Sequence, residues 1–185
     1  QNRHYDRLPF DESLSKRIFN TYLNELDGGK MYFTQQDVDA LKVKYGTSLT
    51  TILQDKKGVE AANEIYGLYR KRVDQRISVA QELLKVAAFD FKSEKTVTRS
   101  RRDEKTPKAT GWPVDEAAAK ELWAGMIEDA MLSETLRRSV IEKRASEQGK
   151  ENPLKDDKPI AEKLQLRYER VKRAIDDEDS EDIAN

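Results

Sequence analysis

The sequence predicts an all-α fold, an elongated multi-helix domain with one long central helix and no sheet. Only 8 Gly and 5 Pro occur in 185 residues, which leaves long windows free of helix breakers. Hydrophobic residues make up 37% of the chain and charged residues another 37%. A composition with so few hydrophobic and so many charged residues favours a layer of helices over a sheet that is covered on both faces. Apolar residues also recur every third or fourth position, as on one face of a helix.

The first helix is expected from about residue 12 to residue 26, with Asp11 as its N-cap. One apolar stripe runs along it, formed by Leu14, Ile18, Phe19, Tyr22, Leu23 and Leu26. The run Asp27-Gly28-Gly29 should end it, because glycine accepts the left-handed backbone that a helix exit often needs. A second, short helix is expected after Thr34, with Asp37 completing a capping box, Phe33 packing on Val38, and an end near Tyr45.

A third, short helix is expected at residues 48–55, before the long central helix at residues 59–88. The apolar seam of the long helix steps by threes and fours, which is typical of coiled-coil-like packing. It comprises Val59, Ala62, Tyr66, Tyr69, Val73, Ile77, Ala80, Leu84 and Ala87. The aromatic pair around Asp90 closes this helix, and residues 92–113 are predicted to form a basic loop.

The next helix is expected from residue 116 to about residue 145, capped by Asp115. Its core-facing residues should be Leu122, Trp123, Met126, Ile127, Leu136 and Val140. A break follows at residues 148–152, and residues 146–158 have the character of an insertion. The last helix is expected at residues 159–176, with one apolar face of Ile160, Leu164, Tyr168, Val171 and Ile175.

Residues 179–183 have the pattern of a new helix start that is cut short at the end of the chain. We therefore expect the chain to be a piece of a longer protein. In this division residues 1–176 form the helical domain, and residues 177–185 begin a truncated linker helix toward the missing part.

No catalytic, cofactor-binding or metal site is expected, and no cofactor is implied. The single histidine, His4, lies near the terminus, where a triad or metal site is hard to build, and no cysteine is present. The neighbouring pairs Ser15-Lys16 and Lys92-Ser93 lie on polar faces or loops, where a lysine keeps its proton. The sequence contains neither a glycine-rich phosphate loop nor a GxSxG motif.

Two charged segments need no binding site to explain them, since the basic loop is expected to be solvated or to dock on an acidic neighbour. The acidic residues between 176 and 182 lack the ligand spacing and central glycine of an EF-hand loop, so helix capping and solvation account for them. Residues 92–108 hold seven basic and three acidic residues but no aromatic residue that could stack on bases. The net charge of −1 gives no global field for nucleic acid or an anionic membrane, and no run of about 18 apolar residues could span a bilayer.

The order of several short motifs resembles the N-terminal helical domain of tail-specific (carboxy-terminal processing) proteases, serine peptidases of the Ser–Lys dyad type. In that family a "YL..LD" helix end precedes an aromatic or apolar pair and "..D(I/V)". The matching segments here are residues 4–5, 11–15, 18–27 and 31–39; Ile65-Tyr66 with Arg70, Arg72 and Arg76; Asp90-Phe91, Trp112-Pro113 and Leu122-Trp123; and residues 166–170 and 180–183. The departures are a longer, more basic loop at residues 99–108 and the insertion.

The resemblance implies a longer, periplasmic parent that also holds a PDZ domain and a peptidase core with the Ser–Lys dyad. Such an enzyme cleaves proteins near or from their C-termini, so its partners are protein substrates. The implied role of this non-catalytic domain is a scaffold and a helical wall that positions substrate beside the PDZ and peptidase domains.

Two other readings stay open from the sequence. A free-standing helical adaptor module, whose seam recruits a partner helix, would be supported by a stop codon directly after residue 185. A nucleic-acid-binding helical protein rests only on the basic excess of residues 92–108 and predicts salt-dependent binding.

Overall fold

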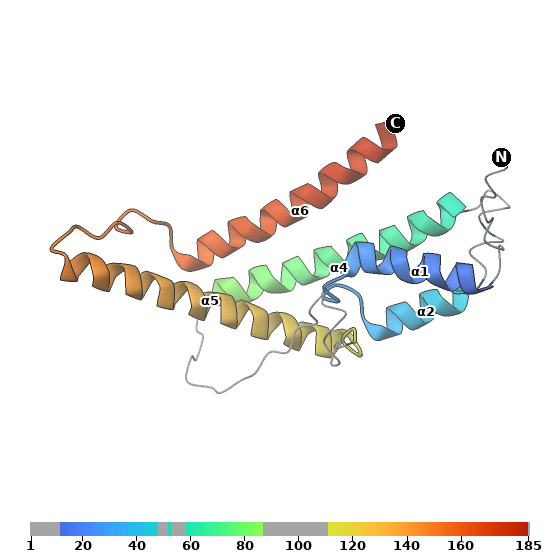
Figure 1. Cartoon of the computed structure of the whole chain (residues 1–185), viewed down its shortest axis with the longest axis horizontal. Helices are drawn as coiled ribbons and strands as arrows, with labels where there is room; N and C mark the ends of the chain where they lie inside the picture. The colour runs from blue at the N-terminus through green and yellow to red at the C-terminus, as the bar shows by residue number, and fades with distance from the viewer. Residues whose placement is uncertain (1–11, 48–51, 53–57, 87–110, 185) are drawn as a thin grey trace, which may run out of the picture. The chain divides into compact units, whose positions relative to one another are not determined.

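The computed structural model describes residues 12–47, 52, 58–86 and 111–184, with side chains as far as residue 177. Five helices follow one another in these residues: α1 (Glu12–Asp27), α2 (Gln35–Tyr45), α4 (Gly58–Val86), α5 (Glu116–Glu147) and α6 (Ile160–Ala184) (Figure 1). The described residues contain no strand, so the predicted all-α class is confirmed. The central helix α4 has 29 residues, and α5 and α6, with 32 and 25 residues, are long as well.

Several predictions fall outside this description. Apart from residue 52, which is helical, the short helix expected at residues 48–55 is not among the described residues. The same holds for His4, for the cap at Asp11 and for all of the basic loop before residue 111.

The described residues fall into two compact units that divide α4 after Arg72 and α5 after Ala119. The N-terminal unit holds α1, α2, the first half of α4 and residues 111–119. The C-terminal unit holds the rest of α4, the rest of α5, the connection at residues 148–159, and α6.

At the start of α4 the buried residues are Ala61 and Ile65, whereas Ala62 and Tyr66 of the predicted seam are only half-buried. The core of the N-terminal unit is therefore built only in part from the predicted apolar stripes. Its buried apolar side chains are Phe19, Leu23, Phe33, Val38, Leu41, Tyr45, Ala61, Ile65, Tyr69 and Ala119. Tyr69 lies at the centre of an aromatic group, with its ring centroid 5.5 Å from that of Tyr32 and 5.9 Å from that of Phe33. Val59, predicted as part of the seam, is 70% exposed instead. Val59 lies two positions before the buried Ala61, and two steps of about 100° each place it on nearly the opposite side of the helix.

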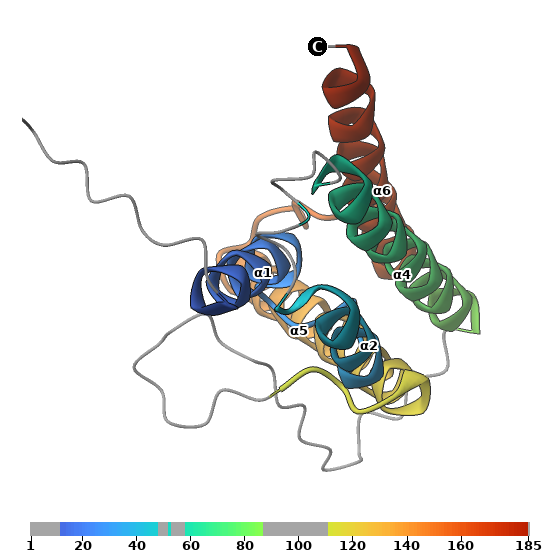
Figure 2. The ribbon, with the colours of Figure 1, turned by 90° about the vertical axis from the view of Figure 1, so that its right-hand side faces the viewer.

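The core of the C-terminal unit gathers side chains from α4, α5 and α6, namely Val73, Ile77, Ala80, Leu84, Trp123, Met126, Ile127 and Leu164. The rings of Trp123 and Tyr168 pack with their centroids 5.7 Å apart. Figure 2 shows α6 beside α4, and Lys172 of α6 contacts Asp74 of α4 at 2.7 Å. The predicted face of α6 therefore packs as expected around Leu164 and Tyr168.

Two predictions on the second half of α5 and on α6 were wrong. Leu136 and Val140 are 58% and 49% exposed, not in the core. The covered face there carries Glu134, Arg138, Ile141 and Ala145, and Leu136 is again two residues, or about 200°, away from it. The helix expected to start anew near residue 179 is the unbroken continuation of α6 to Ala184. Neither glycine nor proline follows residue 159, so nothing in the sequence ends the helix earlier.

The exit from α1 also differs from the prediction. The residue with a left-handed backbone is Lys30 (φ 51°), whereas neither Gly28 nor Gly29 has a positive φ. The exit from α5 follows the usual rule, since Gly149 has φ 63° and its N–H bonds to the carbonyl oxygen of Ser146 at 3.0 Å.

Candidate functional site

A buried carboxylate at the end of α1 organises the turn into α2. Asp27 is 2% exposed. Its Oδ1 accepts a hydrogen bond from the backbone N–H of Met31 at 2.8 Å, and its Oδ2 accepts those of Tyr32 and Phe33 at 3.1 and 3.0 Å. The same Oδ2 accepts the indole N–H of Trp112 at 3.0 Å. Burial raises the pKa of Asp27, and these four hydrogen bonds oppose the rise because they favour the charged form.

A second carboxylate, Asp37, joins the start of α2 to α4. The predicted capping box is confirmed: the Thr34 hydroxyl accepts the N–H of Asp37 at 3.1 Å, and Asp37 accepts the N–H of Thr34 at 2.9 Å. Arg72 of α4 donates to both oxygens of Asp37, at 2.9 and 2.6 Å, and also pairs with Glu116 at the start of α5. Burial works to raise the pKa of Asp37, but the hydrogen bonds from Arg72 and Thr34 together hold it below its ordinary value.

Residues 111–115 bring the start of α5 to the same place. Besides the bond from Trp112 to Asp27, the carbonyl oxygen of Pro113 accepts the N–H of Gln35 at 2.7 Å. The Lys30 ammonium lies 5.1 Å from the centroid of the Trp112 ring, within the range of a cation–π contact. Asp115 caps α5 as predicted, accepting the N–H of Ala118 at 2.9 Å. We call Asp27, Asp37, Arg72 and Trp112 the junction, because they tie α1, α2, α4 and the start of α5 together.

In the N-terminal unit, α1 and α4 border a groove of about 360 Å³. Most of the exposed lining is apolar and comes from Leu14, Ile18, Tyr22, Ala62 and Ile65, and Arg17, Thr21, Glu25 and Gly58 border the groove as well. Tyr22 fastens the two walls, since its hydroxyl donates to the carbonyl oxygen of Ala62 at 3.3 Å. Burial raises the pKa of Tyr22 above its ordinary value, which favours the protonated hydroxyl that donates this bond. An apolar groove between two fixed helices can hold apolar side chains of an extended or helical segment.

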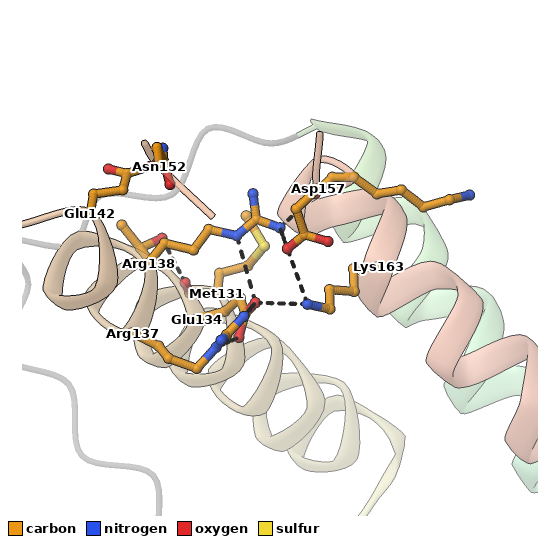
Figure 3. A network of polar contacts seen from close by, with 10 residues as sticks. Met131, Glu134, Arg137, Arg138, Glu142, Asn152, Asp157 and Lys163 are labelled. Carbon is orange, nitrogen blue, oxygen red and sulfur yellow. Dashed lines mark hydrogen bonds and ion pairs between the residues drawn. The ribbon is translucent and has the colours of Figure 1, made fainter. Parts of the chain in front are cut away.

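The C-terminal unit has a polar network that holds the connection between α5 and α6 (Figure 3). Arg138 of α5 donates to Asp157 at 3.0 Å and to the carbonyl oxygen of Lys158 at 2.5 Å. Lys163 of α6 lies 3.3 Å from both Glu134 and Asp157. Asp157 lies within the predicted insertion at residues 146–158. The network therefore ties this segment to α5 through Arg138 and to α6 through Lys163.

Glu134 is the most perturbed acid of this network. It accepts two hydrogen bonds from Arg137, at 2.7 and 2.5 Å, and lies between that residue and Lys163 (Figure 3). The bonds from Arg137, followed by the contact with Lys163, lower the pKa of Glu134 to about 2.

The residues weighed for chemistry from the sequence do not assemble. Ser15 is buried on α1, while the adjacent Lys16 is exposed and lies 3.6 Å from Glu12. Asp176 and Asp177 are on α6, and Lys92 and Ser93 lie outside the described residues. Within the described part of the chain, no three His, Cys, Asp or Glu side chains are grouped to hold a metal ion. None of its helices has the length and apolar character needed to cross a bilayer. The lack of catalytic, cofactor and metal sites in the whole chain stays a prediction.

The sequence pattern does not predict the junction as a unit, although all four of its residues have a place in the expectations above. Asp27 is expected there as a helix end and Asp37 as a capping residue, while Arg72 and Trp112 belong to the family resemblance. An acidic residue before two glycines, with an apolar stripe on its own helix, is the signal that could have marked Asp27 as a buried acceptor. Nothing in the pattern pointed to the pairing of Arg138 with Asp157.

These features define a class of protein: a helical domain in which buried polar contacts fix the helices to one another, and in which two of the helices, α1 and α4, border a groove. Residues 1–185 match the family described as the tail specific protease N-terminal domain, and the chain belongs to this family. It is also 29% identical over 134 residues to the tail-specific protease of Haemophilus influenzae. The match covers 72% of this chain and 18% of that relative, so the chain spans a small part of the relative's length.

Replacing Arg72 by Leu should lower the free energy of unfolding by about 2–3 kcal/mol at pH 7, because Asp37 loses its charged partner. The folded pKa of Asp37 lies below its ordinary value, so the pair stabilises the fold above about pH 4, and this stabilisation is lost as pH falls through the folded pKa. Urea unfolding followed by circular dichroism at pH 7 and pH 3 measures both effects. The exposed neighbour Lys71→Leu is the control, and equal losses in the two variants at pH 7 would contradict the assignment.

A carbon-detected NMR titration should place the pKa of Glu134 at about 2. Arg137→Gln should raise it toward the ordinary 4.5, since it removes the two strongest hydrogen bonds. Because the folded pKa is depressed, Glu134 stabilises the fold at neutral pH and ceases to do so as pH falls toward 2. Lys143→Gln, on the same helix, serves as the control and should leave the titration unchanged. A Glu134 pKa near 4.5 in the unmodified chain would overturn the network as described.

Proposed function

We propose that this chain is the non-catalytic N-terminal helical domain of a periplasmic tail-specific serine endopeptidase, which degrades or processes proteins from their C-termini. In this proposal the domain is a scaffold and a wall that positions substrate. The Ser–Lys dyad, the peptidase core and a PDZ domain belong to parts of the parent outside these 185 residues. Membership of the family and the relative's name, tail-specific protease, support the proposal.

The observation that carries the positioning role is the apolar groove between α1 and α4. Leu14 and Ile18 on one wall are half-buried rather than covered, so their side chains are available to a passing chain. The walls have a fixed spacing because Tyr22 bonds to Ala62 and because the junction ties α4 to the turn that follows α1. A preformed apolar surface of this kind binds unfolded chain segments at a low ordering cost.

A free-standing adaptor module is the second candidate, favoured by the same groove, since a partner helix would fill it as well as a substrate segment. Reading the gene beyond the codon for Asn185 separates the two. Continuation into PDZ and peptidase sequence supports the protease domain, and a stop codon supports the adaptor.

The test of positioning uses the full-length parent with Leu14→Ser and Ile18→Ser in the groove, and Leu136→Ser, exposed on α5, as the matched control. The groove variants should raise KM for an unfolded protein substrate several-fold and leave kcat unchanged, because only substrate binding is weakened. Cleavage of a short peptide that does not reach the groove should be unaffected. An unchanged KM for the protein substrate, or serine-dependent cleavage by the 185-residue chain alone, would contradict the proposal.

A further inference from the structure

A second recess lies in the C-terminal unit, where the first turns of α6 meet α5 and the connection. Its volume is about 430 Å³. Four basic side chains line it, together with two acidic ones and two leucines: Lys158, Lys163, Arg167 and Arg170; Glu134 and Asp157; Leu164 and Leu166. Residues 166–170 are one of the segments that resemble the family, and the junction and groove make no use of them.

The charges of this recess are not balanced. Glu134 and Asp157 are both engaged, by Arg137, Arg138 and Lys163. Lys158 is paired with Glu162 at 2.6 Å. Arg167 and Arg170 are left: both are exposed, and among the described residues neither has an ion pair. Their spacing of three residues puts both guanidinium groups on the same side of α6.

The lining favours one kind of ligand. Guanidinium groups recognise planar carboxylates in a bidentate fashion. Leu164 and Leu166 border the same recess, so a ligand that fills it presents an apolar group next to its negative charge. A bare inorganic anion would leave the leucines unused. A peptide offers the combination in two forms, a C-terminal carboxylate after an apolar residue or an Asp or Glu side chain beside one.

We propose that this recess, with Arg167 and Arg170 as its anion-binding residues and Leu164 and Leu166 as its apolar wall, binds a peptide carboxylate next to an apolar side chain. Where the carboxylate is a C-terminal one, the inference rests on the proposed function and deepens it. The recess then gives the domain a second contact with substrate, in addition to the groove, and this contact binds the C-terminal end of the substrate chain.

Fluorescence anisotropy with labelled ten-residue peptides on the 185-residue chain tests this, with helical content checked by circular dichroism. One peptide ends in Val-Leu with a free carboxylate, the second is its amide, and the third is an amide with an internal Glu-Leu pair. The first should bind, and the double variant Arg167→Gln/Arg170→Gln should weaken it at least tenfold. Arg173→Gln, on the next turn of α6, is the matched control and should change the affinity less than twofold.

The peptide arms separate the two sources of the carboxylate. Loss of binding on amidation supports the C-terminal carboxylate, and equal binding of the Glu-Leu amide supports the side-chain carboxylate. Equal affinity of the double variant and the Arg173→Gln control would overturn the proposal, as would full competition by inorganic phosphate at a concentration equal to that of the peptide. Failure here with an intact KM effect of the groove variants rejects this inference alone. Peptide binding without that KM effect rejects only the proposed positioning role of the groove.

Discussion

The burial of one carboxylate, Asp27, governs the arrangement of the N-terminal unit. A buried charge is tolerated only where hydrogen bonds replace its water, and here three consecutive backbone N–H groups and one indole N–H do so. Satisfying them fixes the chain from Met31 to Phe33, which sets Thr34 at the point where α2 begins. The indole bond brings in Trp112, which lies three residues before the cap of α5. One side chain thereby determines where three helices end or begin.

The polar contacts of the junction and of the network around Asp157 use residues other than the apolar ones that line the groove and the recess. Arg72 is held by Asp37 and Glu116, so α4 is tied at its middle while its first turns and α1 border the groove. In the C-terminal unit, Arg138 and Lys163 neutralise the acids near the recess, which leaves Arg167 and Arg170 as its remaining cations. The recess shares Glu134, Asp157 and Lys163 with the polar network, and the two walls of the groove are joined by the hydrogen bond from Tyr22 to Ala62.

Periodicity and capping residues were sufficient to predict α1, α2, α4, the start of α5 and the packed face of α6, because these features depend on neighbours within four residues. The exposure of Leu136 and Val140 could not be predicted, since it depends on which side of α5 the other elements cover. The left-handed backbone at Lys30 arises because three N–H groups converge on Asp27, a constraint that outweighs the glycines beside it. The junction and the recess join residues up to 85 positions apart, and no local pattern encodes such pairings.

The most direct measurement is the free energy of unfolding of Asp27→Ala, with Asn24→Ala, exposed one turn earlier on α1, as its control. Asp27→Ala should lower the free energy of unfolding by about 3 kcal/mol, because four donors lose their acceptor. Hydrogen exchange should accelerate at the amides of residues 31–33 and at the Trp112 indole in this variant and not in the control. A stability within about 0.5 kcal/mol of the control, with the Trp112 indole still protected, would contradict the central role of Asp27.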